Sequence, residues 1–271
     1  MLSIKSNIMA ENSARLLGQN YNALAKSVER LSSGLRINSA KDDAAGLAVR
    51  ELMRADISVI QQGSRNAADG ISMLQTMEGA MATIDEALVR MKMLAEQAAT
   101  GSYSSSQRTI MNSEFQQMAT EIQRIAHDTK FNSIHLLDCA ASGNNATIHF
   151  GVGSSIAVSS VNVTASSLGL SSSLLTSTTN AQAALNSVTT AISREDSARA
   201  SFGYMMNRLE STNAVLNIQA ENLMASESRI SDVDVATEMA ALTRNQVLTQ
   251  AGVAMLGQAN TMPQMALMLL R

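Results

Sequence analysis

Residues 245–270, NQVLTQAGVAMLGQANTMPQMALMLL, carry no Asp, Glu, Lys or Arg before the chain ends at Arg271. A segment of this composition favours burial away from water. Gln, Asn and Thr side chains interrupt it, however, and a membrane-spanning helix needs roughly 20 predominantly apolar residues. We therefore predict a terminal helix that pairs with protein and does not insert into a membrane.

The composition favours long helices over a compact globule. Only 3% of the residues are aromatic and Trp is absent, whereas Met reaches 18 and Pro only 1. The formal charge of -3 without a basic patch gives no attraction to nucleic acid. Cys139 is the single cysteine, which excludes an internal disulfide and is interpreted as a small buried or half-buried side chain. The first residues lack the apolar core of a signal peptide, which favours a cytosolic protein or export without a cleaved leader.

Heptad-like seams of apolar residues predict the helices, because gaps of three and four keep such residues on one helical face. The first seam predicts a helix over 3–33 with Gly34 available to end it. The others predict a long helix up to Ala98, a shorter one to about Asp128 and a third long one over 180–228. The seams are Leu17, Tyr21, Leu24, Val28, Leu31 and Leu35; Leu74, Met77, Met81, Ile84, Leu88, Met91, Ala95 and Ala98; Met111, Phe115, Met118, Ile122 and Ile125; and Phe202, Leu209, Leu216, Leu223 and Ile230.

The segment between Cys139 and Ser193 is also free of Asp, Glu, Lys and Arg and is rich in Ser and Thr. Alternation at Ile156/Val158 and Val161/Val163 predicts one or two small hairpins in an exposed region. The chain therefore folds back at its middle, as a mainly α, antiparallel, coiled-coil-like rod with a small β-hairpin region. The predicted parts are a terminal helical domain (1–33 and 235–271), connectors (34–46 and 229–234), a helical core domain (47–138 and 180–228) and a β-rich middle (139–179).

The order of these motifs resembles bacterial flagellin, the subunit of the flagellar filament. The resemblance rests on LSSGLRINSAKDDAAGLAV (31–49), the helix through 91–97 and TKFNSIHLLD (129–138) in the N-terminal half. In the C-terminal half it rests on SRISDVDVATEMAALTRNQVLTQAGVAMLGQAN (228–260) and PQMALMLLR (263–271). The middle is short, with SLGL (167–170) still similar to the family, so the resemblance is to a flagellin without large outer domains.

The resemblance implies a homopolymer that is secreted unfolded by the flagellar type III apparatus and added at the filament tip. It also implies an export chaperone on the C-terminal helix, a filament cap and hook-associated proteins as partners. An uncharged terminal helix is soluble only while disordered or held by a chaperone, so we expect it to order when neighbouring subunits bury it. The expected assembly residues are Leu17, Tyr21, Leu24, Val28, Leu31, Leu35, Val253, Leu256, Met265 and Leu269.

Arg90, Leu94 and Glu114 match residues by which flagellins are recognised by the Toll-like receptor that senses flagellin. Arg90 and Leu94 are four residues apart, hence on one helical face, and we expect both to lie near the surface. Packing of neighbouring subunits is the expected primary role of this surface. Receptor recognition is a secondary one.

No catalytic or cofactor-binding pattern is present. His127, His135 and His149 are scattered without ligand spacing, and there is no phosphate-binding loop or nucleophile elbow. Asp232 and Asp234 are interpreted as acceptors at the start of the last helix, with Glu238 in its first turn. A hook–filament junction protein of the same family is the alternative function. An enzyme or a signalling coiled coil is the third, for which no nucleophile, base or ligand cluster is found.

Overall fold

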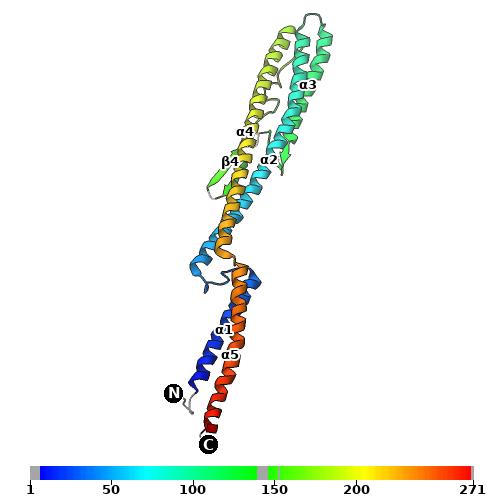
Figure 1. The fold of residues 1–271 in the computed structure, drawn as a ribbon. Helices are drawn as coiled ribbons and strands as arrows, with labels where there is room; N and C mark the ends of the chain where they lie inside the picture. The colour runs from blue at the N-terminus through cyan, green and yellow to red at the C-terminus, as the bar shows by residue number, and fades with distance from the viewer. Residues whose placement is uncertain (1–6, 139–145, 152, 270–271) are drawn as a thin grey trace. The chain divides into compact units, whose positions relative to one another are not determined.

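The protein is described by a computed structural model over residues 7–138, 146–151 and 153–269, with side chains up to Met262. Its elements in chain order are α1 (Ile8–Ser33), α2 (Ala44–Ala99), α3 (Ser105–Asp128), β1 (Lys130–Phe131), β2 (Ile134–His135), β3 (Ala146–Gly151), β4 (Ser154–Val158), α4 (Thr178–Ser231) and α5 (Val235–Leu269) (Figure 1). The predicted mainly α fold, with paired terminal helices and a small hairpin region, is confirmed. Cys139 lies outside the described residues.

The chain divides into two compact units. The terminal unit comprises residues 1–57 and 221–271, and the central unit comprises residues 58–220. This division falls inside the helices α2 and α4, whereas the predicted boundaries lie at the connectors 34–46 and 229–234, which stay a prediction.

The core of the central unit is the predicted seam of α2. All eight seam residues from Leu74 to Ala98 are fully buried, as the heptad spacing indicated. A second buried line, with the same gaps of three and four, runs along α4 and contacts this core. Its members are Ala181, Ala184, Val188, Ala191, Glu195, Ala198, Phe202, Met205 and Leu209. Two facing lines of this kind explain why these long helices need few aromatic anchors.

Polar contacts fix the register of the helices in the central unit. Ser64 donates to Asn213 over 2.6 Å, and Arg199 donates to Glu78 over 2.8 Å, so α2 and α4 run antiparallel. Arg108 of α3 donates to the carbonyl of Ala98 over 2.9 Å, which closes the turn between α2 and α3. The helices are therefore locked along their length by hydrogen bonds as well as by the apolar seams.

The region between β4 and α4 differs from the prediction. Ile156 and Val158 do lie in a hairpin strand, but Val161 and Val163 lie in no strand of the described chain. The expected exposure is also wrong, because this segment packs between α3 and α4. Amide side chains of α3 satisfy its backbone, which removes the need for strand pairing: Asn112 accepts from Leu175, Gln116 donates to Ser173 and Gln123 accepts from Ala165. The buried side chains are Val163, Thr164, Ala165, Leu168, Leu170 and Leu175.

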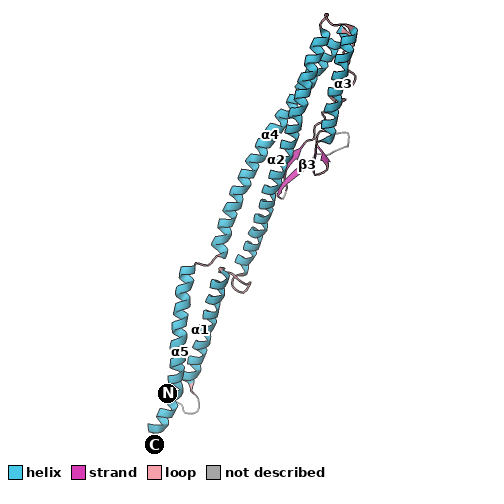
Figure 2. Ribbon diagram, turned by 90° about the vertical axis from the view of Figure 1, so that its right-hand side faces the viewer, coloured by secondary structure: helices cyan, strands magenta, loops and turns pink. Residues whose placement is uncertain are grey.

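The hairpin β3–β4 rests on α2 at two glycines (Figure 2). A Cβ atom at Gly63 would lie 2.6 Å from the carbonyl oxygen of Phe150, and one at Gly70 would clash with the side chain of Ile148. Between them, Asn66 donates to the carbonyl of His149 over 2.9 Å. Because the glycines are seven residues apart, they lie on one face of α2 and leave room for the strand.

Two helices begin earlier than the sequence patterns indicated, because side chains cap them. Asp43 accepts the backbone N–H of Gly46 over 2.9 Å, so α2 begins at Ala44 instead of near residue 47. Ser177 accepts the N–H of Asn180 over 3.2 Å, so α4 begins at Thr178. The predicted connector 34–46 therefore already contains the start of α2.

Candidate functional site

The candidate site is the pair formed by α1 and α5, which lie side by side in Figures 1 and 2. Asn7 caps α1 by accepting the N–H of Ala10, and its amide also donates to the carbonyl of Ala259 over 2.7 Å. At the other end, Gly34 adopts a φ of 73°, the left-handed conformation that glycine accepts most readily, and closes α1. The partner predicted for the uncharged tail is therefore α1 of the same chain.

Asp234 caps α5 as predicted. Its carboxylate accepts the N–H of Ala236 and the hydroxyl of Thr237, and the Thr237 hydroxyl is the main cause of its lowered pKa. Glu238 in the first turn forms an ion pair of 3.4 Å with Arg30 of α1. Asp232 accepts from Ser228 instead, at the end of α4. The capping interpretation holds for Asp234 and first-turn Glu238, whereas Asp232 lies directly after the end of α4.

Small side chains and half-buried leucines make the inner surface of the pair. Only Ser27, Thr249 and Ala259 are fully buried among the described side chains of α1 and α5. Gly252 is closely approached as well, because a Cβ atom there would lie 3.1 Å from Leu17. The two helices are thus in close contact, although few of their described side chains are fully buried.

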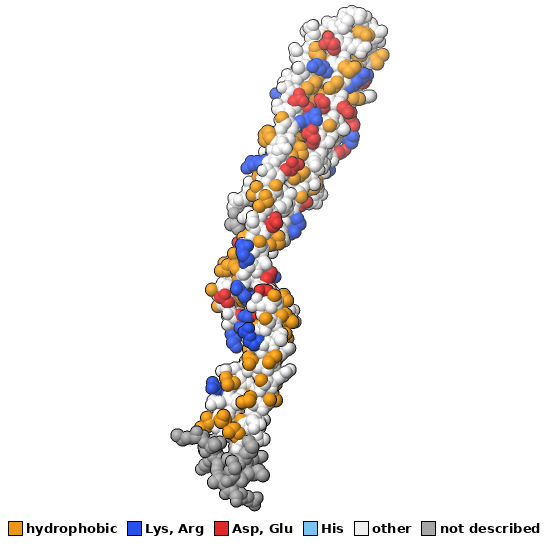
Figure 3. All heavy atoms as spheres, viewed as in Figure 1, with side chains coloured by type: hydrophobic (Ala, Val, Ile, Leu, Met, Phe, Trp, Pro, Cys, Tyr) orange, Lys and Arg blue, Asp and Glu red, His pale blue; other side chains and the backbone are white. Residues whose placement is uncertain are grey.

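Other large apolar side chains of the pair point outwards, as Figure 3 shows on its visible face. In the first seam, Leu17, Leu24, Leu31 and Leu35 are half-buried, whereas Tyr21 and Val28 are 51% and 52% exposed. Of the expected tail residues, Leu256 is half-buried and Val253 is 51% exposed, and the side chains of Met265 and Leu269 lie outside the description. Further exposed apolar residues are Ile8, Met9, Leu16, Val235, Met239, Val247, Leu248 and Met255.

The exposed residues of α5 beyond the expected set were missed by the seam analysis. A signal for them exists in the sequence, because apolar residues occur all around α5 and such a helix is buried on every side in a stable structure. In the described terminal unit, α1 is the helix that contacts α5 most extensively. What remains is an apolar surface without an intrachain partner in the described terminal unit.

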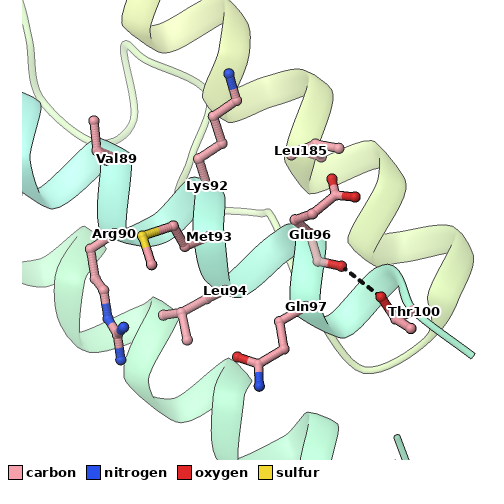
Figure 4. Close-up of a pocket in the computed structure, with 9 residues that line it drawn as sticks. All are labelled: Val89, Arg90, Lys92, Met93, Leu94, Glu96, Gln97, Thr100 and Leu185. Atoms are coloured by element: carbon pink, nitrogen blue, oxygen red, sulfur yellow. Dashed lines mark hydrogen bonds between the residues drawn. The ribbon is translucent and has the colours of Figure 1, made fainter. Parts of the chain in front are cut away.

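A second candidate surface lies in the central unit, where α2 meets α3. Arg90 donates from Nε and Nη2 to one carboxylate oxygen of Glu114, over 2.8 and 2.6 Å, and both residues are partly exposed. Leu94 points to the same side of α2 as Arg90, but it is only 3% exposed, so its expected surface position is wrong (Figure 4). The reason is that α3 packs beside the seam and widens the buried face of α2. A groove of about 570 Å³ nevertheless reaches Leu94 between Arg90 and Gln97.

The described residues were compared with the requirements of a metal site and of a membrane-spanning helix. The described residues contain no group of three or more His, Cys, Asp or Glu side chains that could hold a metal ion. The rings of His127 and His135 lie 5.1 Å apart, and His149 is exposed on β3. Within the described part of the chain, no helix has an apolar run long enough to cross a bilayer. Apolar contact with protein is the chemistry that the α1–α5 pair offers.

Comparison with known proteins shows which protein family this chain resembles. The model of the bacterial flagellin N-terminal helical region matches residues 4–142, and that of the C-terminal helical region matches residues 185–270. The chain belongs to the bacterial flagellin family. It is 43% identical to a flagellin of Halalkalibacterium halodurans over 99% of each chain, and 37% identical to a flagellin of Bacillus subtilis over the full length of both. This flagellin is therefore a structural subunit of the flagellar filament.

Solved structures agree with this assignment. The crystal structure of Bacillus cereus flagellin is 30% identical with a TM-score of 0.52, and the match covers 60% of this chain and 94% of that one. A putative flagellar hook-associated protein from Vibrio parahaemolyticus matches with a TM-score of 0.58 at 14% identity, over 70% of this chain and 100% of that one. The second match shows a shared fold alone, whereas the sequence relatives named above are flagellins. The prediction of a flagellin is therefore confirmed, and it is preferred to the alternative of a hook–filament junction protein.

Proposed function

We propose that this flagellin polymerises through the outward apolar surface of α1 and α5. The observation that carries the proposal is that α1 and α5 leave many large apolar side chains exposed, while few of their described side chains are fully buried. Burying exposed apolar area contributes about 25 cal/mol per Å², so neighbouring subunits that cover this surface stabilise both the contact and the helices. Of the expected assembly residues, Tyr21, Val28 and Val253 are exposed on this surface.

The same surface supports the proposed route of export. A free subunit with uncovered α1 and α5 exposes an apolar surface that favours association, so the chain travels unfolded through the type III apparatus. An export chaperone covers the C-terminal helix beforehand, and the filament cap and hook-associated proteins meet the same helices. Folding of α1 and α5 is completed when neighbours cover them at the tip. The subunit is thus secreted and resides in the extracellular filament.

A charge on this surface tests the proposal. We expect Val253→Glu to reduce the rate of elongation from filament seeds at least tenfold, because the carboxylate loses its water on assembly without gaining a partner. Val253→Ile keeps the position apolar and is expected to elongate like the wild type. Electron microscopy of seeded purified monomer measures both. Equal elongation by the two variants rules out Val253 as an assembly contact.

A second role is favoured by the surface around Arg90 and Glu114. We propose that the free subunit is bound there by the host Toll-like receptor that senses flagellin. The Arg90–Glu114 pair is solvent-accessible, and the neighbouring groove of about 570 Å³ offers Leu94 as an apolar floor. In the filament the same surface packs against neighbouring subunits, so recognition requires the monomer.

Receptor binding of the purified monomer tests this second role. We expect Arg90→Ala to weaken binding by roughly tenfold or more, because it removes a cation and leaves Glu114 unpaired. Arg124→Ala is the matched control, since Arg124 is an exposed arginine of α3 in the same unit with carboxylate partners of its own. Equal affinity of both variants, or no binding by the wild type, contradicts the proposal.

A further inference from the structure

One buried carboxylate in the central unit has no role in the surfaces described above. Glu195 of α4 is 0% exposed, and neither of its carboxylate oxygens has a hydrogen-bond partner. It occupies a seam position of α4, between Ala191 and Ala198, where every other member of the line is apolar. An ionised carboxylate in such a position costs much more free energy than a protonated one.

The nearest cation is already engaged by another carboxylate. Nε of Arg199 lies 3.7 Å from Oε1 of Glu195, too far for a hydrogen bond. The same guanidinium donates two hydrogen bonds, of 3.0 and 2.8 Å, to Oε1 of Glu78 on α2. The second oxygen of Glu78 is also buried without a partner. One guanidinium thus faces two carboxylates, which leaves an excess negative charge between α2 and α4.

The remaining charges around Glu195 do not supply a counterion. Asp85 on α2 and Asp196 on α4 add negative charge beside Glu78. The charged side chains of the neighbouring α3 have other partners. Glu114 pairs with Arg90, Arg124 pairs with Glu121 and Asp128, and Arg108 donates to the carbonyls of Ala98 and Thr100. The pKa of Glu195 is raised to about 7, mainly by burial and next by the negative charge of Asp85. Protonation removes the excess charge without any movement of the helices.

We propose that Glu195 is a proton-binding site of the central unit, which folds with one proton bound there and is therefore more stable at pH 5.5 than at pH 7.5. In the unfolded chain this carboxyl has an ordinary pKa near 4.5 and is ionised at both pH values. The stabilisation is complete below pH 4.5 and is lost as the pH rises through about 7. The neutral form also explains how a glutamate is accommodated at a seam position.

Urea unfolding at the two pH values tests the proposal. A full-length Tyr21→Phe background leaves Tyr103 and Tyr204, which both lie in residues 58–220, as the fluorescent probes of this unit. Between pH 5.5 and 7.5 we expect the folding equilibrium constant to fall roughly 20-fold more in this background than in the same background with Glu195→Gln. The amide of glutamine is uncharged throughout, so it removes this proton uptake while keeping the shape of the side chain.

Two further variants and a direct titration complete the test. Glu114→Gln removes an exposed carboxylate of the same unit and is expected to keep the full pH dependence. Asp85→Asn leaves Glu195 in place but removes a neighbouring negative charge, so it moves the loss of stability to lower pH. In protein labelled with ¹³C-glutamate, the Glu195 carboxyl resonance titrates near neutral pH. An equal pH dependence with and without Glu195→Gln, or a Glu195 resonance already ionised at pH 5.5, overturns the proposal.

Discussion

Flagellin that lacks residues 245–271 is expected to show no elongation from filament seeds. The deletion removes most of α5, including the exposed residues Val253 and Met255 and the inner residues Gly252 and Ala259. It also deprives α1 of the helix against which it packs. The parts of the proposed assembly surface on α1 and on α5 are therefore both lost. We expect this deletion to abolish elongation, whereas a single substitution only slows it.

The control for this deletion is the central unit, whose residues 58–220 are untouched. Its urea transition, followed by the tyrosines in the Tyr21→Phe background, is expected to match that of the full-length chain. Electron microscopy of seeded growth then separates assembly from folding. A truncated chain that elongates at the wild-type rate contradicts the proposed role of the tail.

Leu88→Ala is expected to lower the free energy of unfolding of the central unit by about 2–5 kcal/mol, the usual cost of truncating a buried leucine. Leu88 is fully buried at the middle of the α2 seam. A loss of this size is a large fraction of the stability of an ordinary domain.

The same urea experiment measures this change against a control on the same helix. Met93 of α2 is 57% exposed, so Met93→Ala is expected to alter the free energy of unfolding by no more than about 0.5 kcal/mol. If Leu88→Ala leaves the urea midpoint of the central unit unchanged, the seam is not its core.

The long helices and the pairing of the chain ends could be predicted from the sequence, because heptad spacing is a local signal. The seam from Leu74 to Ala98 is buried throughout, as the spacing indicates. The position of Leu94 could not be predicted in this way, since its burial depends on where α3 packs. The seat of the β3–β4 hairpin on Gly63 and Gly70 likewise depends on contacts between segments far apart in the sequence.

The burial of Glu195 was not predicted from the sequence for a different reason. Glu195 and Arg199 are four residues apart on a helix, which is the usual spacing of a surface ion pair. This spacing suggests an exposed glutamate, so the buried position of Glu195 in α4 was not predicted. Extending the seam of Phe202 and Leu209 towards the N-terminus with gaps of three and four would have reached Glu195. The signal was therefore present, but a charged residue is not normally counted in an apolar seam.

The close contact between α1 and α5, together with their apolar outer face, restricts which mutations these helices tolerate. In an ordinary helix pair, the outer face accepts most polar substitutions and the inner face requires apolar bulk. In this pair, larger side chains at Thr249, Gly252 or Ala259 separate the helices, whereas charged ones at Tyr21, Val28 or Val253 disturb the outer face. Neutral sequence drift therefore has little room in α1 and α5, and variation between lineages is expected to accumulate in other parts of the chain.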